Sequence, residues 1–370
     1  MTRRKIKYII SELNIGGAEV ILADLAAGVK REYDVEVIYF TGSAPLLTKF
    51  EEKGVPVKKL PMKGRVSYRT YSDLTAYLNA EEPDIVHTHL YRADIYGVLA
   101  ARKAKVPVVI STKHNTDEFR KKGGLWVFID RVSMKRCSKL IAVSNAIKDF
   151  FIKYEKAPEN NWVVIYNGVD LNRFNESISR MPDKPEILTK LELDPGLPTV
   201  GTISRLTKQK GQIYLIKSVE QLSKLGVRLN LIIAGDGPDY KFLSDYISEH
   251  GLGRNIKLLG FVPDITHILK AIDIFVYPSL WEGFGVAIIE AQAAGIPVIA
   301  SGVDGIEEII THEKNGFLVP PGSSSEISLQ IRKLLKSPEL SSKISLEAIQ
   351  TVKEKFSMDR FIDSHLRLYA

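Results

Sequence analysis

Residues 273–290 read DIFVYPSLWEGFGVAIIE, and they pass from a strand through a glycine-rich loop into a helix. The buried apolar run 274–277 predicts the strand, and Gly295 with Pro297 beyond it predicts the end of the helix. Glu282 therefore lies on a loop at the carboxyl end of a strand, and Glu290 lies about one turn into the helix. The start of this helix favours an anion, because its first N–H groups lack partners and the helix dipole is positive there.

Each of the two carboxylates has an ordinary explanation when it is taken alone. Glu290 complements a helix dipole, and Glu282 is a solvated loop residue. The pair is separated by seven residues and surrounds Gly283, Phe284 and Gly285. That arrangement indicates a site for a phosphate that carries a polyhydroxyl group.

Length and composition indicate a globular protein of two domains. The chain has 370 residues, more than one hydrophobic core usually supports, with 45% hydrophobic and 26% charged residues. No apolar run approaches the roughly 20 residues of a membrane span. The single cysteine, Cys137, excludes an internal disulfide and suits a reducing cytoplasm. Ser11 and Glu12 interrupt the first apolar stretch, which predicts a strand rather than a signal peptide.

Positive charge gathers in the first half of the chain. The formal net charge is +7, and residues 1–180 carry the excess. In residues 120–139, cations lie beside Trp126 and Phe128, which suits attachment to an anionic membrane surface. The alternative is a solvated helix whose aromatic side chains point into the core. No nucleic-acid-binding module is present in the sequence, so nucleic acid is not an expected partner.

Short β-branched runs alternate with amphipathic segments, which predicts βα units and parallel sheets. The expected fold class is α/β, with two doubly wound, Rossmann-like domains facing one another across a cleft that holds the active site. The predicted domains are residues 1–180 and 181–354, with a linker at 175–185, and residues 355–370 form a helix that returns to the first domain. The predicted strands are 7–10, 35–40, 55–60, 85–88, 106–111, 140–143, 162–166, 199–203, 229–234, 256–259, 274–277, 298–300 and 317–319.

Two further motifs suit phosphate binding. Gly16 and Gly17 open a helix directly after the first strand, where backbone can approach a phosphate closely; a tight turn is the alternative. The third glycine of a dinucleotide fingerprint is missing, which disfavours a dehydrogenase. Arg205 can fork onto two phosphate oxygens, and Lys210 adds a charge five residues later. Together they can hold a diphosphate without a metal, although a solvated basic loop is the alternative.

Three histidines end neighbouring strands of the first domain. His87 and His89 lie on one face of a strand, and a structural role is the simpler interpretation for His87. His114 ends the next strand between Lys113 and Asn115, and this position favours function. No carboxylates are placed to orient the histidines, so no metal is expected.

Two turns of the second domain also lie at strand ends. Gly235 follows one strand, and Val262 follows the next. Both turns could shape a nucleoside pocket, although each pattern alone is turn chemistry.

Taken in order, these motifs cover nearly the whole chain and resemble the retaining glycosyltransferases of family 4, which have the two-domain GT-B fold. The residues that carry the resemblance are Gly16–Glu19, His89, His114, Val143–Asn145, Asn167–Asp170, Arg205, Lys210, Ala234–Pro238, Glu282–Glu290 and Asn315–Val319.

The resemblance implies transfer of a hexose from a nucleoside diphosphate sugar, UDP among the expected nucleotides, to an acceptor hydroxyl with retention and without cofactor or metal. Arg205 and Lys210 would bind the diphosphate, Glu282 the sugar and Glu290 the ribose. The implied catalytic residues are Glu282, His114, Arg205 and Lys210. The implied donor-binding residues are Gly16, Gly17, Arg205, Lys210, Gly235, Val262, Glu282, Gly283, Phe284, Gly285, Val286 and Glu290, and the implied acceptor side is His89, His114 and Asn115.

The expected partners are the sugar donor, a glycan or lipid-linked acceptor and an anionic membrane. The expected role is surface polysaccharide or lipid-linked glycan synthesis in the cytoplasm, on the inner face of the plasma membrane. Two alternatives stay open. One is a nucleotide-sugar 2-epimerase of related fold, and the other is a non-catalytic regulatory protein that binds sugar nucleotides.

Overall fold

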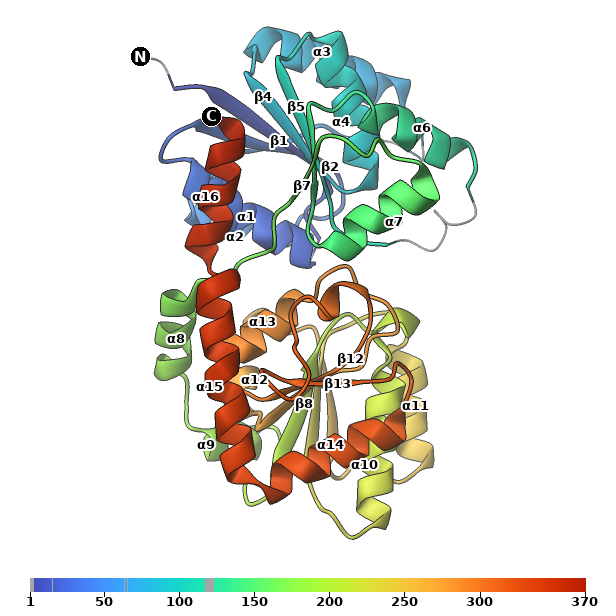
Figure 1. Cartoon of the computed structure of the whole chain (residues 1–370), viewed down its shortest axis with the longest axis vertical. Helices are drawn as coiled ribbons and strands as arrows, with labels where there is room; N and C mark the ends of the chain where they lie inside the picture. Colours follow the sequence, from blue (N-terminus) through green and yellow to red (C-terminus); the bar gives the residue numbers. More distant parts are fainter. Residues whose placement is uncertain (1–2, 15, 63, 65, 117–122) are drawn as a thin grey trace. The chain divides into compact units, whose positions relative to one another are not determined.

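The computed structural model describes residues 3–14, 16–62, 64, 66–116 and 123–370 (Figure 1). It divides into two compact units. The first contains Met1–Asn167 and Asp359–Ala370, and the second contains Gly168–Met358. Each unit is built on one parallel sheet with helices against it, which confirms the predicted α/β class.

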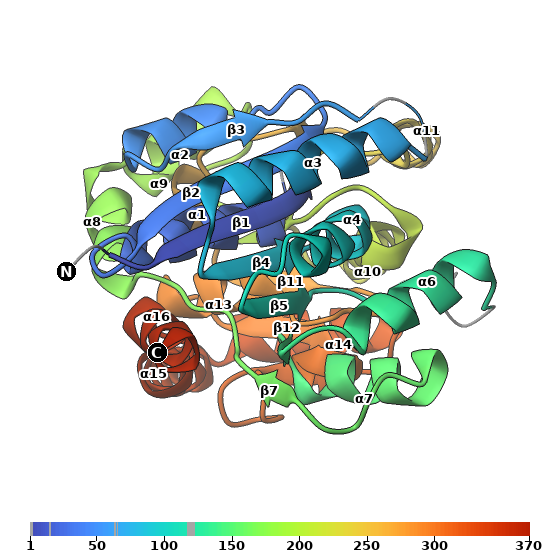
Figure 2. The ribbon, with the colours of Figure 1, turned by 90° about the horizontal axis from the view of Figure 1, so that it is seen from above.

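The first unit has seven described strands in the order β3-β2-β1-β4-β5-β6-β7. Figure 2 shows β3, β2, β1, β4, β5 and β7 following one another in this order across the unit. Every residue of β4 is buried, as expected for a central parallel strand. The strands are β1 (Lys5–Glu12), β2 (Asp34–Thr41), β3 (Val57–Lys59), β4 (Ile85–His89), β5 (Val108–Lys113), β6 (Lys139–Ala142) and β7 (Trp162–Val164). The helices are α1 (Gly17–Val29), α2 (Leu47–Glu52), α3 (Tyr68–Glu81), α4 (Tyr91–Lys103), α6 (Leu125–Met134), α7 (Asn145–Glu155) and α16 (Met358–Tyr369).

The second unit has six strands in the order β10-β9-β8-β11-β12-β13. Apolar side chains from these strands and from helices such as α10 and α14 form one core cluster, which includes Val200, Leu231, Ile274 and Ile299. The strands are β8 (Thr199–Ile203), β9 (Asn230–Ala234), β10 (Ile256–Gly260), β11 (Ile274–Tyr277), β12 (Val298–Ser301) and β13 (Phe317–Val319). The helices are α8 (Leu171–Arg180), α9 (Lys184–Lys190), η1 (Lys208–Lys210), α10 (Gln212–Lys224), α11 (Tyr240–Glu249), α12 (Thr266–Ala271), α13 (Val286–Ala293), η2 (Asp304–Ile306), α14 (Ser324–Lys336) and α15 (Pro338–Lys355).

The stretch 175–185, predicted as a linker, lies largely in helices instead. The side chain of Asp170 caps α8 by accepting the N–H of Arg173 at 3.1 Å, and Phe174 is buried. Contacts with α12 and α13 hold α8 in the second unit. The polar composition of this stretch therefore reflects the exposed face of a packed helix, and the units divide at Asn167 rather than at residue 180.

Helix α16 belongs to the first unit, although it is the last element of the chain. The Tyr369 hydroxyl contacts Nδ1 of His87 at 2.7 Å and accepts from the Tyr8 hydroxyl at 3.2 Å. Nη1 of Arg4 donates to the carbonyl oxygen of Tyr369 at 2.7 Å. These bonds anchor the C-terminal helix to β1 and β4.

Both sheets have a topological switch point, where the chain turns in two directions from the first strand. β1 lies between β2 and β4, and β8 lies between β9 and β11. The loops that follow β8 and β11 therefore emerge side by side, as do those that follow β1 and β4. In doubly wound sheets, ligands bind beyond the carboxyl ends of the strands at this point.

Candidate active site

Three side chains converge above the switch point of the second sheet. Nζ of Lys210 forms an ion pair with Oε2 of Glu282 and donates to the Tyr277 hydroxyl at 2.7 Å. The Tyr277 hydroxyl in turn donates to Oε2 of Glu282 at 3.0 Å. Oε1 of Glu282 accepts the N–H of Gly283 at 3.2 Å. We call Lys210, Tyr277 and Glu282 the Lys210 triad.

The triad is largely shielded from water. The side chains of Lys210 and Glu282 are 16% and 12% exposed, so Glu282 is not a solvated loop residue. Burial opposes charge on Lys210, but Glu282 and Tyr277 outweigh it and hold the pKa of the ammonium above its ordinary value. Burial, reinforced by the Glu282 charge, raises the pKa of the Tyr277 hydroxyl. Lys210 therefore stays charged and Tyr277 stays protonated at neutral pH.

A close backbone contact places the Lys210 loop against the loop that follows β11. Gly211 has φ +62°, and a Cβ at this position would lie 2.2 Å from the carbonyl oxygen of Pro278. The N–H of Leu280 donates to the carbonyl oxygen of Gln209 at 2.7 Å, and Nε2 of Gln209 donates to that of Trp281 at 3.0 Å. Only a residue without a side chain fits at Gly211, so the triad requires a glycine directly after Lys210.

The loop after β12 holds the backbone of Glu282 from the other side. Oδ2 of Asp304 lies 3.4 Å from the N–H of Glu282, and the N–H of Gly305 donates to its carbonyl oxygen at 3.3 Å. A Cβ on Gly305 would lie 2.0 Å from the carbonyl oxygen of Gly283. Asp304 has φ +40°, a left-handed conformation that costs energy in a residue other than glycine. The predicted carboxylate is therefore fixed by its backbone as well as by its side chain.

Arg205 lies on the loop after β8, and its side chain is exposed. The loop itself is rigidly paired: the N–H of Ser204 donates to Ala234 at 3.0 Å, and a Cβ on Gly235 would lie 1.9 Å from the carbonyl oxygen of Ser204. Within the described part of the chain, the Arg205 guanidinium forms no hydrogen bond or ion pair. Lys210 and Glu282 neutralise one another, so Arg205 and the exposed Lys208 supply the uncompensated positive charge of this loop.

Apart from Gly16 and Gly17, which belong to the first unit, the remaining residues predicted for the donor surround the same edge of the second sheet. Gly285 has φ +99°, and α13 begins at Val286 directly behind it, with Glu290 half-buried in its second turn. The N–H of Gly235 donates to Gly260 at 2.7 Å, which ties the loop after β9 to the one that carries the half-buried Val262. The buried Phe284 packs its ring against Phe356, with centroids 5.6 Å apart.

In the first unit, His89 and His114 contact one another at the carboxyl ends of β4 and β5. Nδ1 of His89 lies 3.0 Å from Nε2 of His114. Burial lowers the pKa of His89 well below its ordinary value and that of His114 to about 3, so both rings are neutral at pH 7. Gly16 precedes α1 and Gly17 is its first residue, after β1 of the same sheet.

Three residues near this histidine pair have structural contacts. His87 bonds to Tyr369 and, at 2.7 Å through Nε2, to Thr112, in keeping with the structural interpretation. Nζ of Lys113 lies 2.7 Å from Asp94 and 3.1 Å from Asp130 in a buried network. Lys113 therefore does not support a functional role for its neighbour His114. Asn115 uses its Oδ1 to accept the N–H of Thr116 at 2.9 Å.

Helix α6 exposes large apolar side chains. Leu125, Trp126 and Phe128 are 70%, 39% and 56% exposed, whereas Val127 and Asp130 face inward. The alternative that these aromatic side chains fill the core is therefore wrong. The neighbouring cations Arg120, Lys121 and Lys122 lie outside the described residues.

The described ranges contain neither a candidate membrane-spanning helix nor a candidate metal site. No helix there is both long enough and apolar enough to cross a membrane. No group of three or more His, Cys, Asp or Glu side chains in those ranges is arranged to hold a metal ion.

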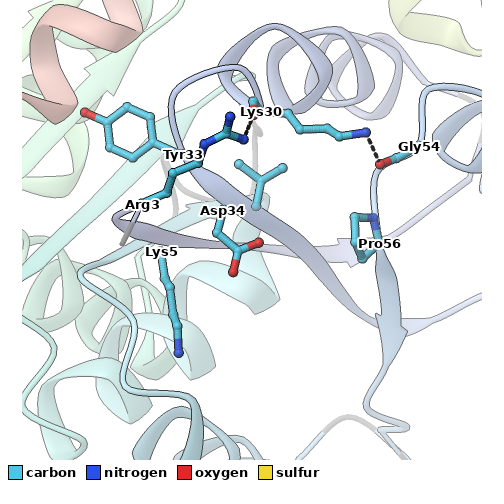
Figure 3. A pocket seen from close by; sticks show the side chains of 8 residues that line it. Arg3, Lys5, Lys30, Tyr33, Asp34, Gly54 and Pro56 are labelled. Carbon is cyan, nitrogen blue, oxygen red and sulfur yellow. Dashed lines mark hydrogen bonds between the residues drawn. The ribbon is translucent and has the colours of Figure 1, made fainter. Parts of the chain in front are cut away.

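A pocket opens at the opposite, amino-terminal edge of the first sheet (Figure 3). Its cations are bonded to carbonyl groups near helix ends: Arg3 to Lys30 at 3.4 Å, Lys30 to Gly54 at 2.6 Å and Lys5 to Glu81 at 2.9 Å. They offset the negative ends of helices. This pocket therefore lies at the opposite edge of the sheet from the histidine pair, and its cations have structural partners. It is lined by Arg3, Lys5, Lys30, Tyr33, Asp34, Val35, Gly54 and Pro56.

Sequence reasoning missed two members of the second-unit site, Tyr277 and Asp304. Tyr277 was assigned only to a buried strand. A hydroxyl on the last residue of that strand, five residues before Glu282, was the available signal. Asp304 has no comparable signal, because its contact with Glu282 depends on how the loop after β12 folds back.

Comparisons with known proteins cover both units. The family model described as Glycosyltransferase Family 4 matches residues 15–173, and that described as Glycosyl transferases group 1 matches residues 183–351. The UDP-Gal:alpha-D-GlcNAc-diphosphoundecaprenol alpha-1,3-galactosyltransferase of Escherichia coli is 35% identical over 65% of this chain, a match that spans 64% of that enzyme. The capsular polysaccharide biosynthesis glycosyltransferase CapM of Staphylococcus aureus is 26% identical over 89% of this chain and 87% of its own length.

A solved structure has the same fold over the whole chain. The crystal structure of Anabaena HepE in complex with UDP-glucose gives a TM-score of 0.86 at 26% identity, and the match covers 98% of each chain. Because the two family models match the two halves in order and the whole fold is shared, this chain belongs to the family 4 glycosyltransferases of the GT-B type.

Proposed function

We propose that this protein is a retaining, metal-independent hexosyltransferase that uses a UDP-hexose and works in surface polysaccharide or lipid-linked glycan synthesis. The observation that carries the proposal is the Lys210 triad at the switch point of the second sheet, with the uncompensated Arg205 on the same loop as Lys210. Fixed cations beside a fixed carboxylate suit a substrate that is anionic at one end and rich in hydroxyl groups at the other.

The leaving diphosphate is the first part of the proposed chemistry. As the bond between the anomeric carbon and the phosphate oxygen breaks, the bonding pair stays on that oxygen and negative charge grows on the diphosphate. Arg205, Lys210 and the start of α13 carry positive charge or dipole before the reaction begins, so they stabilise this charge without reorganisation. No divalent ion is needed for the step.

The transferred sugar is the second part. Glu282 accepts hydrogen bonds from sugar hydroxyls through the lone pairs that the triad leaves free, and Glu290 does the same for the ribose. The acceptor oxygen attacks the anomeric carbon from the face that the diphosphate leaves and gives its proton to the departing phosphate oxygen, and attack from that face retains the configuration. We assign His114, with His89 behind it and Asn115 beside it, to the acceptor side, and Gly16–Gly17 at the same sheet edge to the donor phosphate and the acceptor side.

Relatives support the proposed class of donor and acceptor. The Escherichia coli enzyme is named for UDP-Gal and alpha-D-GlcNAc-diphosphoundecaprenol, HepE was crystallised with UDP-glucose, and CapM is named for capsular polysaccharide biosynthesis. We therefore propose UDP as the nucleotide, with Gly235 and Val262 beside the nucleoside, and a lipid-linked or growing glycan as the acceptor.

The proposed location is the inner face of the plasma membrane, with α6 on the lipid surface. The motivation is the exposed Trp126 and Phe128 beside a basic segment. Flotation with anionic liposomes should carry the wild type upward, and replacing both aromatic residues with Glu should leave it in the soluble fraction. Phe242→Glu is the matched control, because Phe242 is 55% exposed on α11 of the other unit. A wild type that stays wholly soluble would contradict this location.

A transfer assay tests the activity. The protein is incubated with UDP-glucose or UDP-galactose and a lipid diphosphate GlcNAc acceptor, with and without EDTA, and the anomeric configuration of the product is read by NMR. Retained configuration and full activity in EDTA are the expected results. Product formed without an acceptor would favour the 2-epimerase, and tight UDP-sugar binding with neither transfer nor hydrolysis would favour the regulatory protein.

A further inference from the structure

Tyr277 joins both charged members of the donor site, although the sequence pattern predicts only a strand position for it. Its hydroxyl lies 2.7 Å from Nζ of Lys210 and 3.0 Å from Oε2 of Glu282, and the residue is 4% exposed. The Lys210 ammonium also lies 5.0 Å from the centre of the Tyr277 ring, a distance that allows a cation–π contact. The side chain therefore contacts Lys210 through both its hydroxyl and its ring.

The Tyr277 hydroxyl connects the hydrogen bonds of Lys210 and Glu282. An ammonium has three donors. In Lys210 one goes to Tyr277 and one to Glu282, which leaves the third for a ligand in a direction that the other two define. The Tyr277 hydroxyl accepts from Lys210 and gives its single proton to Oε2 of Glu282. If Lys210 turns toward a diphosphate, Glu282 loses its counter-ion but keeps the Tyr277 donor and the N–H of Gly283.

We propose that Tyr277 is a positioning residue of the transfer reaction: its hydroxyl aims the free N–H of Lys210 at the diphosphate and keeps Glu282 hydrogen-bonded when that lysine engages the donor. This inference rests on the proposed function, because it assumes that the triad binds a nucleoside diphosphate sugar. Tyr277 itself contacts neither the sugar nor the phosphate. It acts through Lys210 and Glu282, whose charges it holds ready before the leaving group departs.

The test uses Tyr277→Phe, which removes the hydroxyl and keeps the ring. We expect kcat for hexosyl transfer to fall by about 10- to 100-fold, as expected for loss of a hydrogen bond to a charged group, and KM for the donor to change much less. Tyr246→Phe is the matched control, because Tyr246 donates to Glu220 at 2.9 Å away from the site. This control should transfer at the wild-type rate.

A double-mutant cycle on UDP binding, measured by calorimetry, separates positioning from structural damage. Free UDP carries the negative charge that the donor gains only as its bond breaks, so Tyr277→Phe should weaken UDP binding even where KM for the donor changes little. In a Lys210→Ala background the same substitution should change UDP binding less than about twofold, because the hydroxyl acts through that lysine. Additive losses, or a kcat within twofold of the wild type, would overturn the inference while the proposed function stands. A wild type that binds UDP but transfers no sugar would contradict the proposed function and leave the cycle to decide on Tyr277. A wild type that does not bind UDP would overturn both.

Discussion

Replacing Lys210 with Met tests the charge pair at the centre of the site. The substitution keeps an unbranched apolar stem and removes the ammonium. Its partner Glu282 would then be a carboxylate that is 12% exposed and has no counter-ion. Breaking a buried ion pair from one side costs about 3–5 kcal/mol. Because Tyr277 and the N–H of Gly283 still donate to Glu282, we expect the lower end, about 3 kcal/mol.

That loss can be measured against a second lysine of the same unit. Lys333 also pairs with a carboxylate, that of Glu313, and its ammonium lies 5.0 Å from the centre of the Phe317 ring. Its side chain is 42% exposed, so Lys333→Met should cost less than about 1 kcal/mol. Thermal unfolding should show a decrease of roughly 5–10 °C for Lys210→Met and little change for Lys333→Met.

The same pair of variants separates stability from catalysis. With the folded fraction controlled, hexosyl transfer by Lys210→Met should fall by about 10²- to 10³-fold, the effect of removing one preorganised charge that stabilises the transition state. Lys333→Met should transfer normally. The reasoning would be refuted if Lys210→Met kept transfer within about fivefold of the wild type, or if its stability loss did not exceed that of Lys333→Met.

Three further outcomes follow from named contacts. Glu282→Ala should lower transfer by orders of magnitude while circular dichroism shows a folded chain; near-normal turnover would remove its assigned role. In a denaturant titration, Gly211→Ala should destabilise the protein by more than the roughly 1 kcal/mol that a left-handed alanine costs, because its Cβ would also meet the Pro278 carbonyl oxygen. Gly226 has φ +77° and open space around it, so Gly226→Ala should show only the conformational cost. Burial lowers the pKa of His365 to about 4, so between about pH 4 and pH 6.5 the unfolded chain binds more protons than the folded chain. The free energy of unfolding should therefore fall as the pH is lowered from 6.5 toward 4. An equally steep fall in His365→Gln would count against His365 as the cause.

Local sequence patterns predicted the elements of both sheets. Each predicted strand overlaps an observed one, from β1 (Lys5–Glu12) to β13 (Phe317–Val319). The reason is that the central strands of a parallel sheet are buried on both faces and therefore appear in the sequence as continuous apolar runs. The position of Glu282 on a loop and of Glu290 inside a helix followed from the same patterns, since Gly285 and Gly295 mark the two ends of that helix.

Composition alone misjudged segments whose environment is set by distant partners. The polar stretch at 175–185 was predicted to be a linker, but contacts with α12 make residues 175–180 part of a packed helix. Lys113 was read as support for His114, although Asp94 and Asp130 bind its ammonium in the core. In both cases the sequence shows that a residue is polar but does not show which distant residues it contacts.

The sequence by itself therefore determined which segments form strands, which loops carry charge and which family the chain resembles, because these depend on neighbours along the chain. Only the tertiary structure decided that β8 lies beside β11, that Tyr277 completes the pair formed by Lys210 and Glu282, and that Trp126 faces outward. Those facts depend on strand order and on contacts between residues far apart in the chain. Such contacts form when each sheet buries its two apolar faces, and no local pattern records them.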